Sequence, residues 1–365
     1  MSSSEPAAEP IRVGRAYRPA VWAAVCALGI AGWLASFAGA DHARVWRALL
    51  INFNFFTPLA AGLVTWSAIL LASRGLWQLG IERPVMSGLF FAVPSVVALV
   101  ALWIGSPAWA PWYGARGLSQ GWWLNNTFVF VRDLVVLVGF WIVAAAYTCR
   151  RREGRGTRLA GFLILAYGVT FTVLGFDLVM ALDPRWYSTL FGGYFFVSGI
   201  YAALVLWTLD TARKPDSTGD ELHDLGKLVV AFSLLTTYLM YAQLLVIWYE
   251  NMPRETGFLV PRMNFYPWAG VSIALLATVY LGPLAILLTI WSKRSRWFLG
   301  GFAALLLVGL WVERWWQVAP TFSPNLTFGL AEAAMVVAFI GAFGLATTLF
   351  ERRTPPDAFG RLVGE

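Results

Sequence analysis

The chain alternates between long apolar stretches and short polar connections along almost its whole length. Apolar stretches of about 20 residues are long enough to cross the ~30 Å hydrocarbon core of a bilayer as helices. Ten stretches of this kind occur, at residues 20–40, 49–72, 85–105, 126–149, 159–181, 189–211, 225–248, 268–291, 297–318 and 328–349. A transmembrane β-barrel would instead have short segments of alternating polarity. The pattern predicts an all-α, polytopic membrane protein with ten transmembrane helices.

Composition agrees with this prediction. The chain is 59% hydrophobic and 13% charged, whereas a soluble protein carries roughly twice that charged fraction. We expect an N-terminal segment at 1–19, a transmembrane domain at 20–350 and a C-terminal tail at 351–365. The first apolar stretch follows three arginines, as in a signal peptide, but it is longer than the usual hydrophobic region of one. We therefore expect it to be retained as a span.

The basic residues are unevenly divided between the two sides of the membrane. With ten spans, 19 of the 27 Lys and Arg residues lie on the side of both termini, six lie on the other side, and Arg132 and Arg314 lie within spans. Cytoplasmic loops carry the excess of Lys and Arg, so both termini are expected to be cytoplasmic. The net charge of +7 is then a consequence of topology and does not indicate a nucleic-acid partner.

Histidine and cysteine are too scarce for a redox cofactor held by this chain. The two histidines, His42 and His223, fall in connections on opposite sides of the membrane, and Cys26 and Cys149 fall in separate spans. Haem needs axial ligands that face each other, and iron–sulfur clusters need grouped cysteines. We expect no bound cofactor or metal, and two free thiols.

Two connections have a distinct composition. The segment 105–125 is rich in Trp, Pro and Gly, and we expect it to lie along the membrane interface as part of an aromatic belt. The charged segment 212–224 offers Ser217 or Thr218 as the N-cap of the next helix.

Charged residues within or at the edge of the spans need an explanation, because a charge at the bilayer centre costs at least ~2.5–3.5 kcal/mol. All of the embedded carboxylates fall in the outer half of the predicted spans. The candidates are Asp133, Asp177, Glu313 and Glu332, with Asp183, Glu250 and Glu255 at the outer boundary and Arg132, Arg185, Arg254 and Arg314 as charge partners.

Two interpretations of these charges remain open. In the first, Arg132–Asp133 and Glu313–Arg314 are structural groups that find partners on other helices, since adjacent helical residues point about 100° apart. In the second, they form a polar path open to the outside, in which desolvated carboxyl groups exchange protons. Asp177 is the strongest single candidate for such a path, because no basic residue precedes it in its own span.

Two rows of hydroxyl groups at helical spacing extend inward from these charges. Tyr167 and Thr170 share a face with Asp177, and Ser233, Thr237 and Tyr241 follow each other at intervals of four. Ordered water would be needed for proton conduction along them. Such hydroxyls are also ordinary helix-packing groups in membranes, so both roles remain open.

Two motifs carry a family resemblance. QLLVIWYENMPRET, at 243–256, is similar to the QxxLIWYANIPEET signature of the ActF-type membrane subunit of bacterial alternative complex III. FDLVMALDPRWYSTLFGGYFF, at 176–196, resembles the D-x-x-M-(S/A)-L-(D/E)-P-H-W-x-S-T-x-F-G run of the same family. This chain departs from the pattern at Glu250 and Arg254, and it has Arg185 where the family has His. A proton role of that His would not transfer, because Arg does not titrate near neutral pH.

The resemblance implies NrfD-like helical bundles in the bacterial cytoplasmic membrane and a subunit without cofactors of its own. It implies a NrfD-like quinol subunit (ActC), an iron–sulfur subunit and a multihaem cytochrome c as partners, beside membrane lipid. Haem c and iron–sulfur clusters would belong to other subunits, with menaquinol or another quinol as substrate. The expected role is support of quinol:cytochrome c electron transfer through proton translocation or a quinone site. A purely structural anchor is the alternative, followed by a stand-alone secondary transporter, which would show unwound helices or charges near the midplane.

Overall fold

The computed structural model describes residues 18–73, 85–115, 117, 120–154 and 157–355, which form helices, turns and no strand. The helices are α1 (Arg18–Ala35), η2 (Ser36–Ala38), α2 (His42–Ala72), η4 (Ser87–Phe91), α4 (Ala92–Trp109), α5 (Asn126–Arg152), α6 (Thr157–Leu178), η5 (Met180–Leu182), α7 (Leu190–Arg213), α8 (Gly219–Glu250), α9 (Pro253–Met263), α10 (Trp268–Leu275), η6 (Leu276–Tyr280), α11 (Gly282–Ile286), α12 (Ile290–Arg294), α13 (Arg296–Val318), η7 (Ala319–Thr321) and α14 (Leu330–Arg353).

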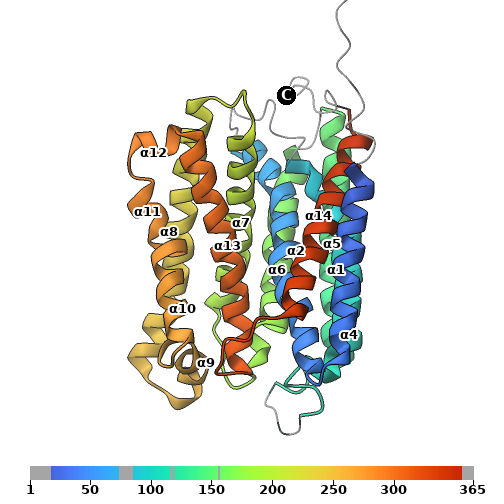
Figure 1. Cartoon of the computed structure of the whole chain (residues 1–365), viewed down its shortest axis with the longest axis vertical. Coiled ribbons are helices and arrows are strands. Elements are labelled where there is room, and N and C mark those ends of the chain that lie inside the picture. The colour runs from blue at the N-terminus through green and yellow to red at the C-terminus, as the bar shows by residue number, and fades with distance from the viewer. Residues whose placement is uncertain (1–17, 74–84, 116, 118–119, 155–156, 356–365) are drawn as a thin grey trace, which may run out of the picture.

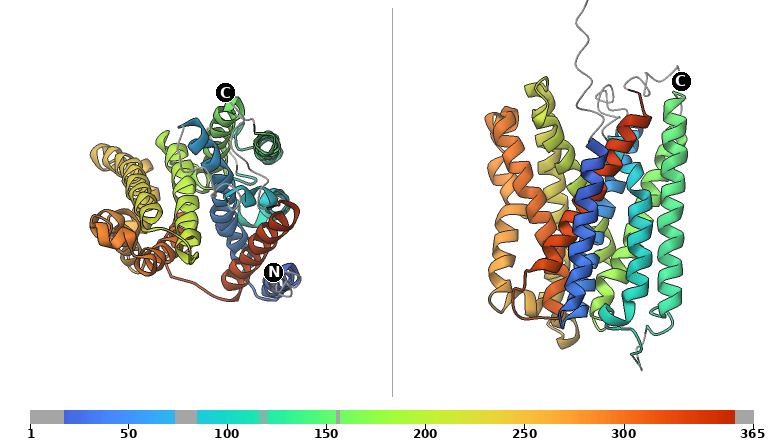
Figure 2. Two further views of the ribbon diagram at one scale, coloured as in Figure 1. Left: turned by 90° about the horizontal axis from the view of Figure 1, so that it is seen from above. Right: turned by 45° about the vertical axis from the view of Figure 1, so that its right-hand side comes forward.

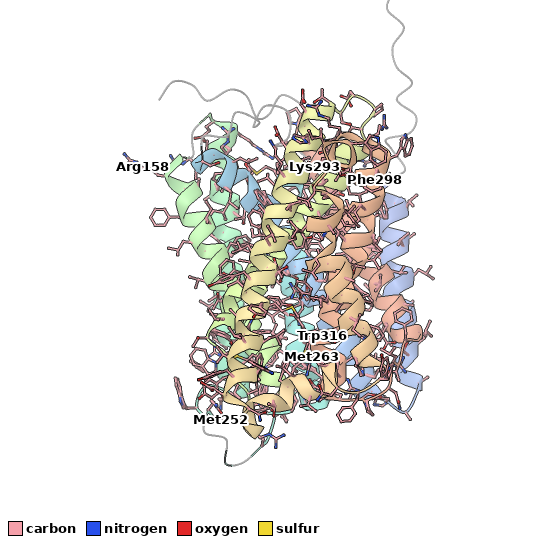
Figure 3. The ribbon with its side chains drawn as sticks, turned by 90° about the vertical axis from the view of Figure 1, so that its left-hand side faces the viewer. Arg158, Met252, Met263, Lys293, Phe298 and Trp316 are labelled. Carbon is pink, nitrogen blue, oxygen red and sulfur yellow. The ribbon has the colours of Figure 1, made fainter. Side chains whose placement is uncertain are left out.

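Within this described part, nine helical segments are long and apolar enough to cross a membrane. They run roughly parallel or antiparallel to one another in a single bundle (Figure 1). The chain is therefore a multi-pass, all-helical membrane protein. We call the end of the bundle at which α1 begins and α14 ends the terminal side, and the other end the opposite side. Figure 3 places Arg158 and Lys293 at the terminal side and Met252 at the opposite side.

Burial differs sharply between helices. The most apolar window of α2 is 89% buried, and that of α8 is 22% buried. A helix that is apolar all round is typical of the centre of a membrane bundle. In the view from above, α2 lies between α7 and α14, whereas α8 lies at the periphery (Figure 2).

Glycine allows the first and last spans to pack closely. A Cβ atom on Gly29 would lie 2.6 Å from the Cα atom of Ala338, and one on Gly341 would lie 2.6 Å from the Cα atom of Cys26. Small residues let transmembrane helices approach until their backbones touch. The first span thus packs against the last one, at the edge of the bundle.

The predicted eighth span, 268–291, is not a continuous helix. It divides into α10, the π-helical segment η6, α11 and α12. Pro283 has no N–H, so it cannot bond to the carbonyl of Val279. That carbonyl accepts a hydrogen bond from the Tyr201 hydroxyl at 3.5 Å, and the carbonyl of Tyr280 accepts one from Thr237 at 3.3 Å. Hydroxyls of neighbouring helices therefore satisfy the broken backbone, as a membrane interior requires. The expectation of one continuous transmembrane helix at 268–291 is therefore wrong.

The connections also differ from the predictions in part. Trp109, the last residue of α4, and Trp112, which packs against Phe130 of α5, are buried, whereas Trp122 is highly exposed. The expected interfacial belt is therefore partly a piece of the core. Thr218 is the N-cap of α8, in a capping box with Glu221.

Candidate functional site: two buried polar clusters

Asp177 lies at the centre of the first cluster, near the opposite side of the bundle. Its carboxylate is fully buried and accepts hydrogen bonds from the Arg132 Nε at 2.9 Å and from the indole of Trp123 at 2.8 Å. The guanidinium carbon of Arg132 also stands 3.7 Å from the centre of the Trp123 ring. The carboxylate therefore has a cationic partner on α5, although none precedes it on α6.

Asp133 completes this cluster without any donor of its own. It is fully buried, its carboxyl group lies against that of Asp177, and neither of its oxygens receives a hydrogen bond from a described residue. A buried polar atom normally has at least one hydrogen-bond partner. The first cluster thus holds two carboxyl groups against one guanidinium.

Glu313 lies at the centre of the second cluster. It is fully buried on α13 and its Oε1 accepts hydrogen bonds from the hydroxyls of Tyr194 and Tyr280, the latter at 2.5 Å. The two tyrosine oxygens lie 2.9 Å apart. The Oε2 atom has no donor among the described residues. Tyr280 is the last residue of η6, so the break in the eighth span helps to place its hydroxyl here.

Arg314 follows Glu313 in the chain but belongs to a different set of contacts. Its guanidinium donates to the hydroxyl of Ser198 and to the Gln317 side chain, the latter at 3.1 Å, and stands 4.6 Å from the centre of the Phe195 ring. Gln317 in turn donates to the Tyr194 hydroxyl at 3.1 Å. Neutral groups therefore link the two adjacent charges.

The other predicted acids lie apart from both clusters or at the surface. Glu332 forms a two-point ion pair with Arg44, at 2.7 and 2.9 Å, and accepts the backbone N–H of Gly329. Asp183 accepts the backbone N–H of Arg185 at 3.3 Å, and the Arg185 side chain is highly exposed. Glu250 is exposed. The side chains of Arg254 and Glu255 lie outside the described part of the structure.

The hydroxyl rows are bonded to backbone carbonyls. Tyr167 donates to the carbonyl of Pro58 at 3.0 Å, and Thr170 donates to that of Val136 at 3.1 Å. Ser233 bonds to Val230 within its own helix, and Thr237 bonds to Ser233 in the same way. Tyr241 is exposed on the outer face of α8. These contacts bind helices together or satisfy the hydroxyls locally.

Sequence reasoning missed several members of the clusters, all of them neutral: Trp123, Tyr194, Ser198, Tyr280 and Gln317. A usable signal was present, because Tyr194 and Ser198 are four residues apart on α7, and Glu313 and Gln317 are four apart on α13. Residues at this spacing share one helix face. Two such polar pairs in apolar spans indicate helices that face each other.

Arg262 is a further buried cation that the sequence did not single out. Its guanidinium donates to the carbonyls of Phe258, Trp316 and Gln317. Burial lowers the pKa of Arg262 to about 9, which leaves the group charged at pH 7. These bonds fix α9 against the end of α13.

The segment 176–196 packs against α9, just beyond the end of the segment 243–256. Trp186 stacks on Phe258 with ring centres 4.0 Å apart and an angle of 6° between the ring planes. Between α8 and α9, Asn251 adopts a left-handed conformation with φ of 47° and ends α8, and Pro253 begins α9. The motif 243–256 therefore forms a tight corner between two helices on the opposite side.

Neither known families nor curated proteins add an identification. No family model matches the chain, and no curated protein matches it. Among the residues that the structure describes, no three His, Cys, Asp or Glu side chains come together as metal ligands would.

Proposed function

We propose that the chain is a cofactor-free membrane subunit of a quinol-oxidising complex of the alternative complex III type, and that it carries protons at the Asp133–Asp177 pair. The family part of this proposal rests on the motifs at 176–196 and 243–256. The excess of Lys and Arg on the terminal side supports a cytoplasmic location for that side. The pair then lies toward the outer face, where quinol oxidation by a partner subunit would release protons.

The charge balance of the first cluster carries the proposal. Two carboxyl groups and one guanidinium have a net charge of −1 when all are ionised. A net charge buried in a membrane bundle is costly. One proton shared between Asp133 and Asp177 makes the cluster neutral, as in other carboxyl pairs that share a site. Asp133 is the natural holder of this proton, because Arg132 and Trp123 donate to Asp177.

The test is Asp133→Asn in the purified, reconstituted complex. This variant removes the exchangeable proton and leaves the Arg132–Asp177 ion pair in place. We expect normal assembly, at least a tenfold loss of turnover or of proton release, and loss of the infrared band of a protonated carboxylic acid. Asp177→Asn is less decisive, because it also deprives Arg132 of its partner.

Glu250→Gln is the matched control, since Glu250 is an exposed carboxylate on the same side and should change neither quantity. Unchanged turnover, proton release and infrared spectrum in Asp133→Asn would exclude the proton-carrying role. If Asp133→Asn lowers the yield of assembled complex, but the complex that does assemble is fully active, a structural anchor would be favoured.

One observation favours a second candidate function, a secondary transporter. The eighth span is broken at η6 and α11, and discontinuous helices form the substrate sites of many transporters. The buried Glu313 lies beside that break. This function would be supported if the chain purifies without redox partners and if proteoliposomes that contain it take up an ion.

A further inference from the structure

A large groove runs along the last span, separate from both clusters. Its volume is about 1,920 Å³, with α2 as its floor and α14, α7 and α13 as its walls. Pockets for small molecules have volumes of roughly 300–1,000 Å³. Residues of α14 from Ala333 to Glu351 line it, a length of about 27 Å at 1.5 Å per residue. The groove therefore follows most of the ~30 Å hydrocarbon depth.

The lining is apolar along this depth and charged at the terminal end. Aromatic and aliphatic side chains form the floor, among them Phe56, whose ring centre lies 5.4 Å from that of Phe339. At the terminal end, Lys214 is paired with Asp210 at 3.2 Å. Arg213 is exposed and has no ion pair or hydrogen bond to another described residue. Glu351 on α14 also lines this end and has an interaction of its own. Arg213 is thus a guanidinium at the mouth of the groove without a bonded counter-ion among the described residues.

Trp207 supplies an independent observation. It lines the groove six residues before Arg213, it is 2% exposed, and its indole N–H has no hydrogen-bond partner in the described structure. A buried N–H without an acceptor costs about 1–3 kcal/mol. An acceptor at this depth, just inside the charged end, would remove that cost.

We propose that this groove binds an anionic phospholipid from the leaflet on the terminal side. The acyl chains lie over the apolar floor, the phosphate group lies at Arg213, and an ester carbonyl accepts the N–H of Trp207. Basic pockets between transmembrane helices recognise anionic headgroups in this way. The proposal is independent of the proton-carrying role, because it uses no residue of the two clusters.

The test is native mass spectrometry of the full chain in nanodiscs that contain equal amounts of phosphatidylglycerol and phosphatidylcholine. We expect the wild type to retain phosphatidylglycerol preferentially, and Arg213→Gln to reduce this preference about fivefold, which corresponds to ~1 kcal/mol per basic residue. Trp207→Phe should weaken retention of both lipids. Arg158→Gln is the matched control, because Arg158 lies at the same end of the bundle and does not line the groove (Figure 3).

A second pair of variants tests the groove itself. Val336→Trp places an indole in the groove and should abolish lipid retention, whereas Val135→Trp, at an exposed site on α5, should not. Equal retention in Arg213→Gln and Arg158→Gln, or in Val336→Trp and Val135→Trp, would overturn the proposal. So would a photo-crosslinker at Ile340 that captures a protein segment in native membranes, because a partner helix would then occupy the groove.

Discussion

The two clusters stabilise buried charges by different means. At the first cluster, Asp177 on α6 is neutralised by Arg132 on α5, directly and across helices. At the second, Glu313 and Arg314 are consecutive residues of one helix and do not bond to each other. Two tyrosines, a serine and a glutamine serve them instead.

Geometry explains this difference. Consecutive residues on a helix point about 100° apart, so Glu313 and Arg314 reach different neighbours. In the first cluster, most of the stabilisation comes from a single ion pair. In the second cluster, it comes from several hydrogen bonds to neutral groups. Removal of one partner should therefore be far more damaging at the first cluster than at the second.

The largest effect is expected for Arg132→Met. This change leaves the buried Asp177 without its cation, and breaking a buried ion pair from one side costs about 3–5 kcal/mol. We expect a steep loss of folded chain in size-exclusion chromatography and thermal unfolding. Arg185→Met, at a highly exposed arginine, is the control and should be nearly neutral. A loss below about 1 kcal/mol in Arg132→Met would contradict the contrast between the clusters.

Tyr194→Phe should have the largest effect among single changes of neutral groups in the second cluster. The Tyr194 hydroxyl contacts Glu313, Tyr280 and Gln317, so its removal leaves buried groups with fewer partners. We expect a loss of about 1–3 kcal/mol in thermal or denaturant unfolding. Tyr187→Phe, at an exposed tyrosine, controls for the loss of a hydroxyl. An effect as large as that of Arg132→Met would show that the network acts as one unit.

Trp123→Phe should reduce stability by about 1–2 kcal/mol. It removes one hydrogen bond to the carboxylate of Asp177 and keeps an aromatic ring near Arg132. The measurement is the unfolding midpoint, with Trp122→Phe as the control on the exposed neighbour. A midpoint equal to that of the control would mean that Arg132 alone holds Asp177.

The smallest effect is expected for Thr237→Val, about 0.5 kcal/mol. The Thr237 hydroxyl already bonds within α8 at 2.7 Å, and its contact with the carbonyl of Tyr280 is longer, at 3.3 Å. A double-mutant cycle with Tyr280→Phe measures whether this contact supports the second cluster. Strictly additive losses would show that it does not.

The spans were largely predictable because their length and apolarity follow from the thickness of the hydrocarbon core. Nine of the ten predicted stretches correspond to continuous helical segments among the described residues. The remaining stretch, the predicted eighth span at 268–291, is not a continuous helix although its composition is also apolar. Its interruption depends on Pro283 together with the hydroxyls of Tyr201 and Thr237, which satisfy the backbone from other helices. Nothing local in the stretch reveals those partners.

For the site, the sequence by itself determined which helices carry buried carboxylates and toward which end of the bundle they lie, because carboxylates in apolar helices are conspicuous and rare. Only the tertiary structure decided how they pair. Asp177 pairs with Arg132, and Glu332 pairs with Arg44, which lies 288 positions away in the chain. Asp133 has no hydrogen-bond donor among the described residues. Pairing depends on how helices rotate and cross, and that follows from the packing of the whole bundle. The hydropathy pattern indicates how deep a residue lies in the membrane, but it does not indicate which neighbouring residue it contacts.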